Sequence, residues 1–205
     1  MIDRAARSIL DRQLPDGGFN IYKGGPSEIS ASVKAYFALK LAGLKPEEDR
    51  MAQLRDRILA LGGIQSANSY VKLNLSLFGL YPREFTPSVP PEMMLLGNLI
   101  YEMSSWTRAI VIPLAIVDAL NTGRPAPAGF TVDELLVPGV PLEFPNDEGF
   151  FSWRNFFILA DKAVKLWERH GSKSIRDKAI AKCKEWILDR TRYTDGLAAI
   201  YPPMK

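Results

Sequence analysis

The chain has 205 residues, of which 47% are hydrophobic and 24% charged, and its formal net charge is +3. This size fits one domain with a sizeable core. The basic residues are spread along the chain without a cluster or a groove-binding motif, so the charge gives no indication of nucleic-acid binding. One cysteine, Cys183, excludes an internal disulfide and fits a reducing compartment.

No apolar stretch reaches the roughly 18 residues that a membrane-spanning helix needs. The first residues also lack the apolar centre of a signal peptide. We therefore expect a cytoplasmic protein, either free or lying on a membrane surface as a peripheral or monotopic protein.

Apolar residues recur with helical spacing in most of the chain, and no useful stretch alternates with period two. Serine, proline or acidic residues precede several of these segments, and glycine or proline follows them. The predicted helices cover residues 3–13, 27–41, 46–61, 66–78, 104–120, 149–170 and 174–191, with a short helix after Pro91. We predict an all-α fold of helical hairpins that must stack to bury their apolar faces.

Local signals refine this prediction at several points. Ser27 is the expected N-cap of the second helix. Pro113 interrupts the fifth predicted helix and is expected to kink it. Residues 81–91 and 121–148 are rich in proline or in proline and glycine, and we predict loops there.

A glycine-rich turn, Gln13-Leu-Pro-Asp-Gly-Gly-Phe19, follows the apolar pair Ile9-Leu10. A side-chain amide can hydrogen-bond the backbone of such a turn, and an aromatic ring six residues later can cover it. We expect Gln13, Gly17 and Phe19 to clasp helices together and to carry no reaction. A degraded second copy runs through Trp186-Ile187, Thr191 and Asp195-Gly196.

The two turns resemble the glutamine–tryptophan (QW) repeat of the squalene-hopene and oxidosqualene cyclases, which are class II terpene cyclases of triterpenoid biosynthesis. Further stretches similar to this family are Tyr22-Lys-Gly-Gly-Pro26, Lys34-Ala-Tyr-Phe-Ala-Leu-Lys40, Gly62-Gly-Ile-Gln65, Pro90-Pro-Glu-Met-Met94 and Tyr101-Glu-Met-Ser-Ser-Trp-Thr-Arg-Ala109. The resemblance implies that residues 1–205 form one α/α-barrel domain, equivalent to the second, inserted barrel of these cyclases. It also implies that this sequence lacks part of the catalytic apparatus, because the catalytic Asp-x-Asp-Asp motif lies in the family's other domain and does not occur in this sequence.

The resemblance also places side chains in the lining of a cyclization cavity. The implied lining residues are Tyr70, Trp106, Ile200, Tyr201 and Pro202. In the family the tryptophan that matches Trp106 offers its π face to a carbocation. The residues alone leave open a second interpretation, in which Trp106 is a core side chain of an apolar helix. Tyr201 stands where the family has a glutamine that orders water, and Tyr70 where it has a phenylalanine.

The predicted helix over residues 149–170 is rich in aromatic residues and has basic residues on its flanks. This pattern suits the interfacial zone of a membrane, and it also suits a buried helix with solvated lysines. The resemblance favours the first interpretation, because the corresponding family helix surrounds the substrate entrance in the membrane. The expected membrane-facing residues are Phe151, Trp153, Phe156, Phe157 and Trp167.

These observations predict part of a terpene cyclase that supplies cavity wall and membrane face for polyene cyclization, an isomerase or lyase type of reaction. No residue of this chain is assigned a catalytic role, and the chain alone is expected to be inactive. The resemblance implies no metal or organic cofactor, and one histidine with one cysteine cannot form a zinc site of soft ligands. The expected partners are a polyene or isoprenoid lipid, an acid-bearing cyclase domain in cis or in trans, a membrane and a second copy, but no nucleic acid. Two alternatives stay open: a subunit of a two-chain cyclase, and a non-catalytic isoprenoid or lipid carrier.

Overall fold

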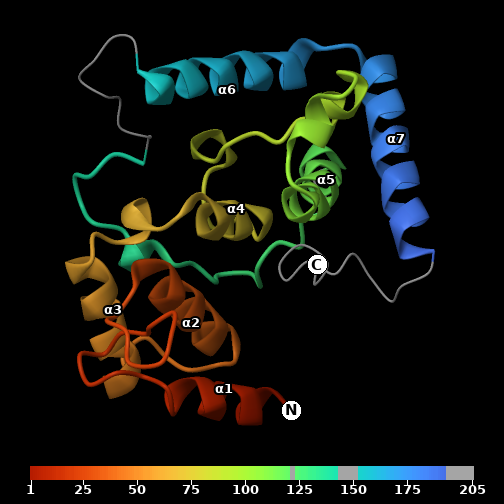
Figure 1. Cartoon of the computed structure of the whole chain (residues 1–205). Helices are drawn as coiled ribbons and strands as arrows, with labels where there is room; N and C mark the ends of the chain where they lie inside the picture. Colours follow the sequence, from red (N-terminus) through yellow and green to blue (C-terminus); the bar gives the residue numbers. More distant parts are fainter. Residues whose placement is uncertain (121–122, 143–151, 193–205) are drawn as a thin grey trace. The chain divides into compact units, whose positions relative to one another are not determined.

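A computed structural model of the chain describes residues 1–120, 123–142 and 152–192, and in these ranges it contains helices and irregular segments but no strand (Figure 1). The predicted all-α class is therefore confirmed. The chain forms two compact units, unit 1 from Met1–Thr86 with Arg124–Glu143 and unit 2 from Pro87–Gly123 with Phe144–Lys205. Closure of the helices into one barrel domain over residues 1–205 stays a prediction.

Unit 1 contains four α-helices and the irregular segment that returns to it after residue 123. The helices are α1 (Ile2–Leu10), α2 (Ile29–Leu41), α3 (Asp49–Ala60) and α4 (Ser69–Leu77). Short 3-10 helices are η1 (Ile64–Ser66), η2 (Arg83–Phe85) and η5 (Asp133–Leu135). Every α-helix predicted in this part of the chain is present, with ends that differ by a few residues.

The N-cap prediction for α2 is wrong by one residue. Glu28 caps the helix, because its carboxylate accepts a hydrogen bond from the backbone N–H of Ala31 at 2.7 Å. The Ser27 hydroxyl donates instead to Asp16 at 2.6 Å. The nearby Asp16 carboxylate is a stronger acceptor than water, so it takes the hydroxyl away from the helix end.

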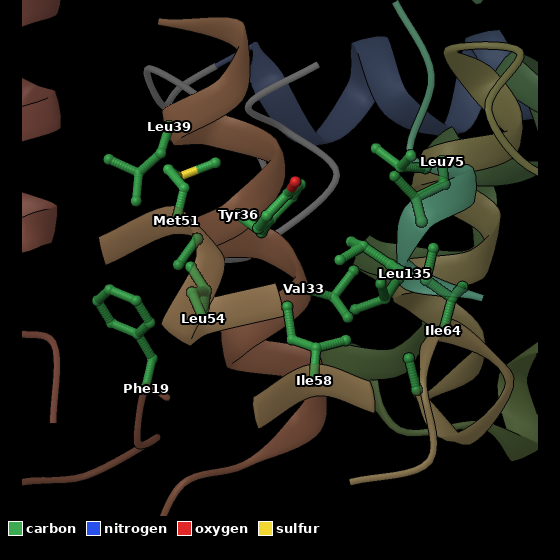
Figure 2. Packing of buried hydrophobic residues seen from close by; sticks show 14 of the residues in the cluster. Phe19, Val33, Tyr36, Leu39, Met51, Leu54, Ile58, Ile64, Leu75 and Leu135 are labelled. Atoms are coloured by element: carbon green, nitrogen blue, oxygen red, sulfur yellow. The ribbon is translucent and has the colours of Figure 1, made fainter. Parts of the chain in front are cut away.

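The core of unit 1 forms around α2, which is buried on several sides (Figure 2). Tyr36 and Leu39 of α2 are fully buried, as are Leu54 and Ile58 of α3. Leu135 of η5 completes this core although it lies far along the sequence. Each fully buried aliphatic side chain contributes about 1.5–3 kcal/mol, so the return segment is an integral part of unit 1.

Unit 2 contains α5 (Ser105–Leu120), α6 (Trp153–His170) and α7 (Lys173–Thr191), with the 3-10 helices η3 (Pro91–Leu95) and η4 (Leu99–Glu102). The α5 helix continues through Pro113. The core combines Met94, Ile100, Ile112, Cys183 and Trp186 from η3, η4, α5 and α7. In the described part of the chain, α6 contributes no residue to either core.

Candidate functional site

In unit 1 the Gln13 side chain joins the turn after α1 to the first turn of α3. Its Nε2 atom donates to the carbonyl oxygens of Gly17 at 2.8 Å and Arg50 at 2.9 Å. Its Oε1 atom accepts from Nε of Arg50 at 3.0 Å, and the same guanidinium donates to the Leu10 carbonyl at 3.0 Å. Gly17 has φ 85°, and a Cβ there would lie 2.7 Å from the Gln53 carbonyl. The turn is thus a mechanical connection between helices.

Phe19, which closes the first turn sequence, and Trp186, which opens the degraded second copy, are both buried. Phe19 is 7% exposed, and its backbone N–H donates to the Ser32 hydroxyl of α2 at 3.0 Å. Trp186 is 6% exposed in the core of unit 2. Thr191, which stands in the glutamine place of the second copy, donates back to the Ile187 carbonyl of its own helix at 3.0 Å. The rest of that copy lies outside the described residues, and its assignment as a family repeat stays a prediction.

Trp106 lies in the first turn of α5 and is 52% exposed. The chain on its N-terminal side is held by polar contacts, since the Ser104 hydroxyl accepts from the Thr107 backbone N–H at 3.1 Å. Arg108 donates to the Tyr101 carbonyl at 3.1 Å and lies 5.2 Å from the centre of the Tyr101 ring. The indole therefore projects from a fixed helix end and is available to a ligand or to another part of a larger protein.

Tyr70 occupies the same kind of position on α4. It lies in the first turn, is 46% exposed, and follows Asn68, whose side chain caps the helix by accepting from the Val71 N–H at 3.0 Å. The structure places Tyr70 in unit 1 and Trp106 in unit 2. Ile200, Tyr201 and Pro202 lie outside the described residues, as does Phe151, so the predicted cavity lining stays a prediction.

The α6 helix carries the largest described group of exposed aromatic side chains. Trp153, Phe156 and Phe157, here called the aromatic triplet, are 78%, 57% and 63% exposed. Their ring centroids lie 5.6–6.2 Å apart, within the range of favourable aromatic pairs. Leu159, at 68% exposed, extends this apolar surface. Exposed apolar clusters of this size are typical of surfaces that contact a membrane or another protein. None of the helices in the described ranges is long and apolar enough to cross a bilayer.

Trp167 has a different environment from the triplet. It is 41% exposed, lies near the end of α6, and donates its indole N–H to Glu92 of η3 at 3.2 Å. Its place on a membrane face stays a prediction.

The main charged cluster in unit 1 links α2 to the return segment. Glu134 accepts hydrogen bonds from the Tyr36 hydroxyl at 2.8 Å and from the Lys40 ammonium group, which also donates to the Thr131 carbonyl at 2.7 Å. Burial would raise the pKa of Glu134, but the hydrogen bonds from Lys40, its own backbone and Tyr36 together lower it. Burial and the neighbouring Glu134 raise the pKa of Tyr36. This cluster stabilises the fold and offers no open position to a substrate.

The sequence patterns do not indicate Glu92 or Glu134, although each of these carboxylates joins segments that lie far apart in the chain. The partners of Glu92 are 75 and 84 residues away, and Lys40 is 94 residues from Glu134. A lone carboxylate between proline and methionine residues was the one available signal for Glu92. Single-sequence patterns carry no information on contacts over such separations.

The described part of the chain is thus an all-α protein with a glutamine-clasped turn, two exposed aromatic side chains at helix starts, and an aromatic surface helix. The sequence model described as "Squalene-hopene cyclase N-terminal domain" matches residues 1–205. The chain therefore belongs to the squalene-hopene cyclase family.

Individual relatives agree with this assignment. The chain is 39% identical over 190 residues to a squalene–hopene cyclase of Zymomonas mobilis, covering 91% of this chain and 29% of the relative. It is 32% identical over 206 residues to a squalene–hopene cyclase of Alicyclobacillus acidocaldarius, covering 98% and 32%. A dammaradiene synthase of Dryopteris crassirhizoma is 28% identical over 214 residues, covering 99% and 30%. The chain thus spans less than a third of the length of these curated relatives.

Proposed function

We propose that this chain supplies a wall of the cyclization cavity and the membrane-contacting surface in a squalene-hopene-cyclase-like terpene cyclase. Family membership over the whole chain supports the class of reaction. The observation that carries the surface role is the aromatic triplet of α6, which is exposed and has neighbouring leucines but no buried residue on its helix. A polyene substrate is apolar, so the protein must meet it where lipid is present.

In this proposal the chain acts on the substrate through aromatic faces and through shape. A cyclizing polyene carries positive charge along its carbon chain after protonation of its terminal double bond. An indole face stabilises a nearby cation by about 0.5–2 kcal/mol, and this is the role proposed for Trp106. The proton donor comes from another segment, because the Asp-x-Asp-Asp motif is absent from these 205 residues.

A reconstitution experiment tests the division of labour. The chain is incubated with squalene alone, and then with a separately produced segment of the Zymomonas mobilis relative from outside the part that this chain matches. We expect no hopene from the chain alone and hopene from the mixture. Trp106→Ala should reduce the product of the mixture by about 2- to 30-fold, whereas Trp106→Phe, which keeps a π face, should retain more of it. Hopene from the chain alone would show that the acid is supplied internally and that the proposal is wrong.

A vesicle flotation experiment tests the membrane surface. Replacing the aromatic triplet with alanine removes three exposed rings, and we expect the partition coefficient on lipid vesicles to fall at least about tenfold. Leu188→Ala on α7 is the control, because Leu188 is an apolar side chain of similar exposure, 68%, that lies outside α6. An equal loss for both variants would refute a specific role of α6. Retained lipid in native mass spectrometry, together with no product from the reconstituted mixture, would favour the lipid-carrier alternative.

A further inference from the structure

The connection between α6 and α7 is a tight corner built around Trp167. The α6 helix ends at His170 and α7 begins at Lys173 (Figure 1). The Gly171 backbone N–H donates to the Trp167 carbonyl at 2.6 Å. A Cβ at Gly171 would lie 2.6 Å from that carbonyl oxygen and 2.7 Å from Cε2 of the indole. Glycine is therefore required here by the close approach of the Trp167 ring.

Glu92 connects this corner to the core of unit 2. Its Oε1 atom accepts from the Trp167 indole N–H at 3.2 Å and from Nε of Arg176, on α7, at 3.1 Å. The side chains of Glu92 and Arg176 are only 15% and 22% exposed. Charged groups at this depth contribute most when they are paired, and removing one partner is costly. One carboxylate oxygen thus joins the end of α6 to the start of α7.

The base that carries Glu92 is itself fixed. Pro91 and Met94 of the same 3-10 helix are buried, and Met94 belongs to the core of unit 2 with Cys183 and Trp186. The Cys183 thiol lies 3.9 Å from the Pro91 carbonyl. The backbone that carries Glu92 is therefore packed into the core of unit 2 on both sides of this residue.

Two more polar contacts hold α6 within unit 2. Asp161 accepts from the Ser88 backbone N–H at 2.7 Å, and Glu168 lies 3.5 Å from the Ser88 hydroxyl. Asp161 lies at the middle of the helix and Glu168 near its C-terminal end. Phe157 is one turn before Asp161 on the same side, yet it is 63% exposed. The aromatic rings near the start of α6 are thus exposed, and the corner at the other end of the helix contributes to the direction of α6.

We propose that Glu92 is a positioning residue that, with Trp167 and Gly171, fixes the angle between α6 and α7 and so directs the aromatic triplet. The contacts among Glu92, Trp167 and Gly171 do not depend on what the aromatic triplet binds. Only the consequence for membrane contact rests on the proposed function.

The expected displacement follows from the lever length. From Leu159 to His170 the helix is about 16 Å long at about 1.5 Å per residue. A swing of about 20° at the corner would move Leu159 by about 5–6 Å, by simple trigonometry on that helix length. Spin labels at Leu159→Cys and Leu188→Cys can measure this, because both positions are 68% exposed on their separate helices. Cys183 is fully buried and does not compete for the label.

Pulsed electron–electron double resonance on the labelled chain gives the distribution of distances between the spin labels on α6 and α7. We expect one narrow distribution for the parent and a broadened or shifted one for Glu92→Ala. Trp167→Phe, which removes the indole N–H and makes the ring smaller, and Gly171→Ala, which displaces the ring, should change the distribution in the same way. Glu185→Ala, an exposed carboxylate of α7, is the control and should leave it unchanged. If Glu92→Ala fails to fold, Trp167→Phe and Gly171→Ala provide the test.

Two outcomes would show that Glu92 does not fix the angle between α6 and α7: an unchanged distance distribution in the folded variants, or an equal change in Glu185→Ala. Vesicle binding separates this failure from failure of the proposed function. If the triplet variant binds vesicles like the parent, the membrane role is wrong whatever the distance distributions show. If the triplet variant loses binding but the corner variants keep the parental distribution, the corner is wrong and the membrane role stands.

Discussion

Glu134→Gln should loosen unit 1 and leave unit 2 unchanged. Glutamine keeps the size of the side chain and one acceptor for the Tyr36 hydroxyl, but it removes the negative charge that faces Lys40. The Lys40 side chain is only 15% exposed and would be left beside a neutral partner. A charge-assisted hydrogen bond contributes about 1.5–3 kcal/mol. Because Glu134 is 25% exposed, solvent recovers part of the loss, and we expect a destabilisation of about 2 kcal/mol.

Hydrogen-exchange mass spectrometry measures this change locally. An effect of about 2 kcal/mol raises the opening constant of α2 by about 30-fold. Unit 2 gives an internal reference, because all four tryptophans, at positions 106, 153, 167 and 186, belong to it. Their fluorescence in urea should therefore report an unchanged midpoint. Lys40→Met and the double variant complete a cycle in which we expect a coupling of about 1–2 kcal/mol.

The matched control is Glu47→Gln, which neutralises an exposed carboxylate of the same unit and should change stability by less than about 0.5 kcal/mol. Equal exchange in α2 for Glu134→Gln and Glu47→Gln, or an additive double variant, would show that the contact between Glu134 and Lys40 does not stabilise unit 1.

Three further predictions use other measurements. The pKa of Glu134 is lowered from its ordinary value of 4.5, so the ionised carboxylate stabilises unit 1 fully above that value, and this contribution is lost as the pH falls through the lowered pKa. The exchange protection of α2 should therefore decline in acid, and it should decline less in Glu134→Gln. Gln13→Ala removes three hydrogen bonds at a partly exposed site and should weaken α1 exchange protection by about 1–2 kcal/mol, whereas Gln53→Ala, an exposed glutamine of α3, should not. Burial, with a smaller effect of the Glu92 charge, raises the pKa of the Cys183 thiol to about 11, so alkylation at pH 8 should be slow until urea unfolds unit 2; rapid labelling of the native protein would contradict its core position.

The helical class and the positions of the α-helices follow from local sequence. Helical spacing of apolar residues and the glycine and proline breaks predict each α-helix to within a few residues, because these signals act over one or two turns. The prediction that Ser27 caps α2 was wrong because the Ser27 hydroxyl donates to Asp16, which is 11 residues away in the sequence but close in space. Local patterns cannot include such a competitor.

The candidate site could be predicted only in part. The sequence predicted the aromatic helix and placed Trp106 and Tyr70 in helices, but it did not predict that both side chains are exposed at helix starts. It could not identify Glu92 or Glu134, since their partners are brought together by packing. Trp167 shows this limit of the sequence patterns. Its place in the aromatic pattern predicts a membrane contact, but the pattern does not predict that its indole N–H donates to the carboxylate of Glu92 on η3.

The two compact units alternate along the chain, since each takes one segment from the first part and one from the second. During synthesis the ribosome must therefore release residues 124–136 before α2 receives Glu134 and Leu135, although α2 itself emerges about a hundred residues earlier. Until then the apolar surface of α2 is uncovered in the nascent chain, and unit 2 has already begun to emerge. Neither unit can be cut out of the gene as one continuous segment, and a proteolytic nick between them would leave the two segments of unit 1 joined only by noncovalent contacts.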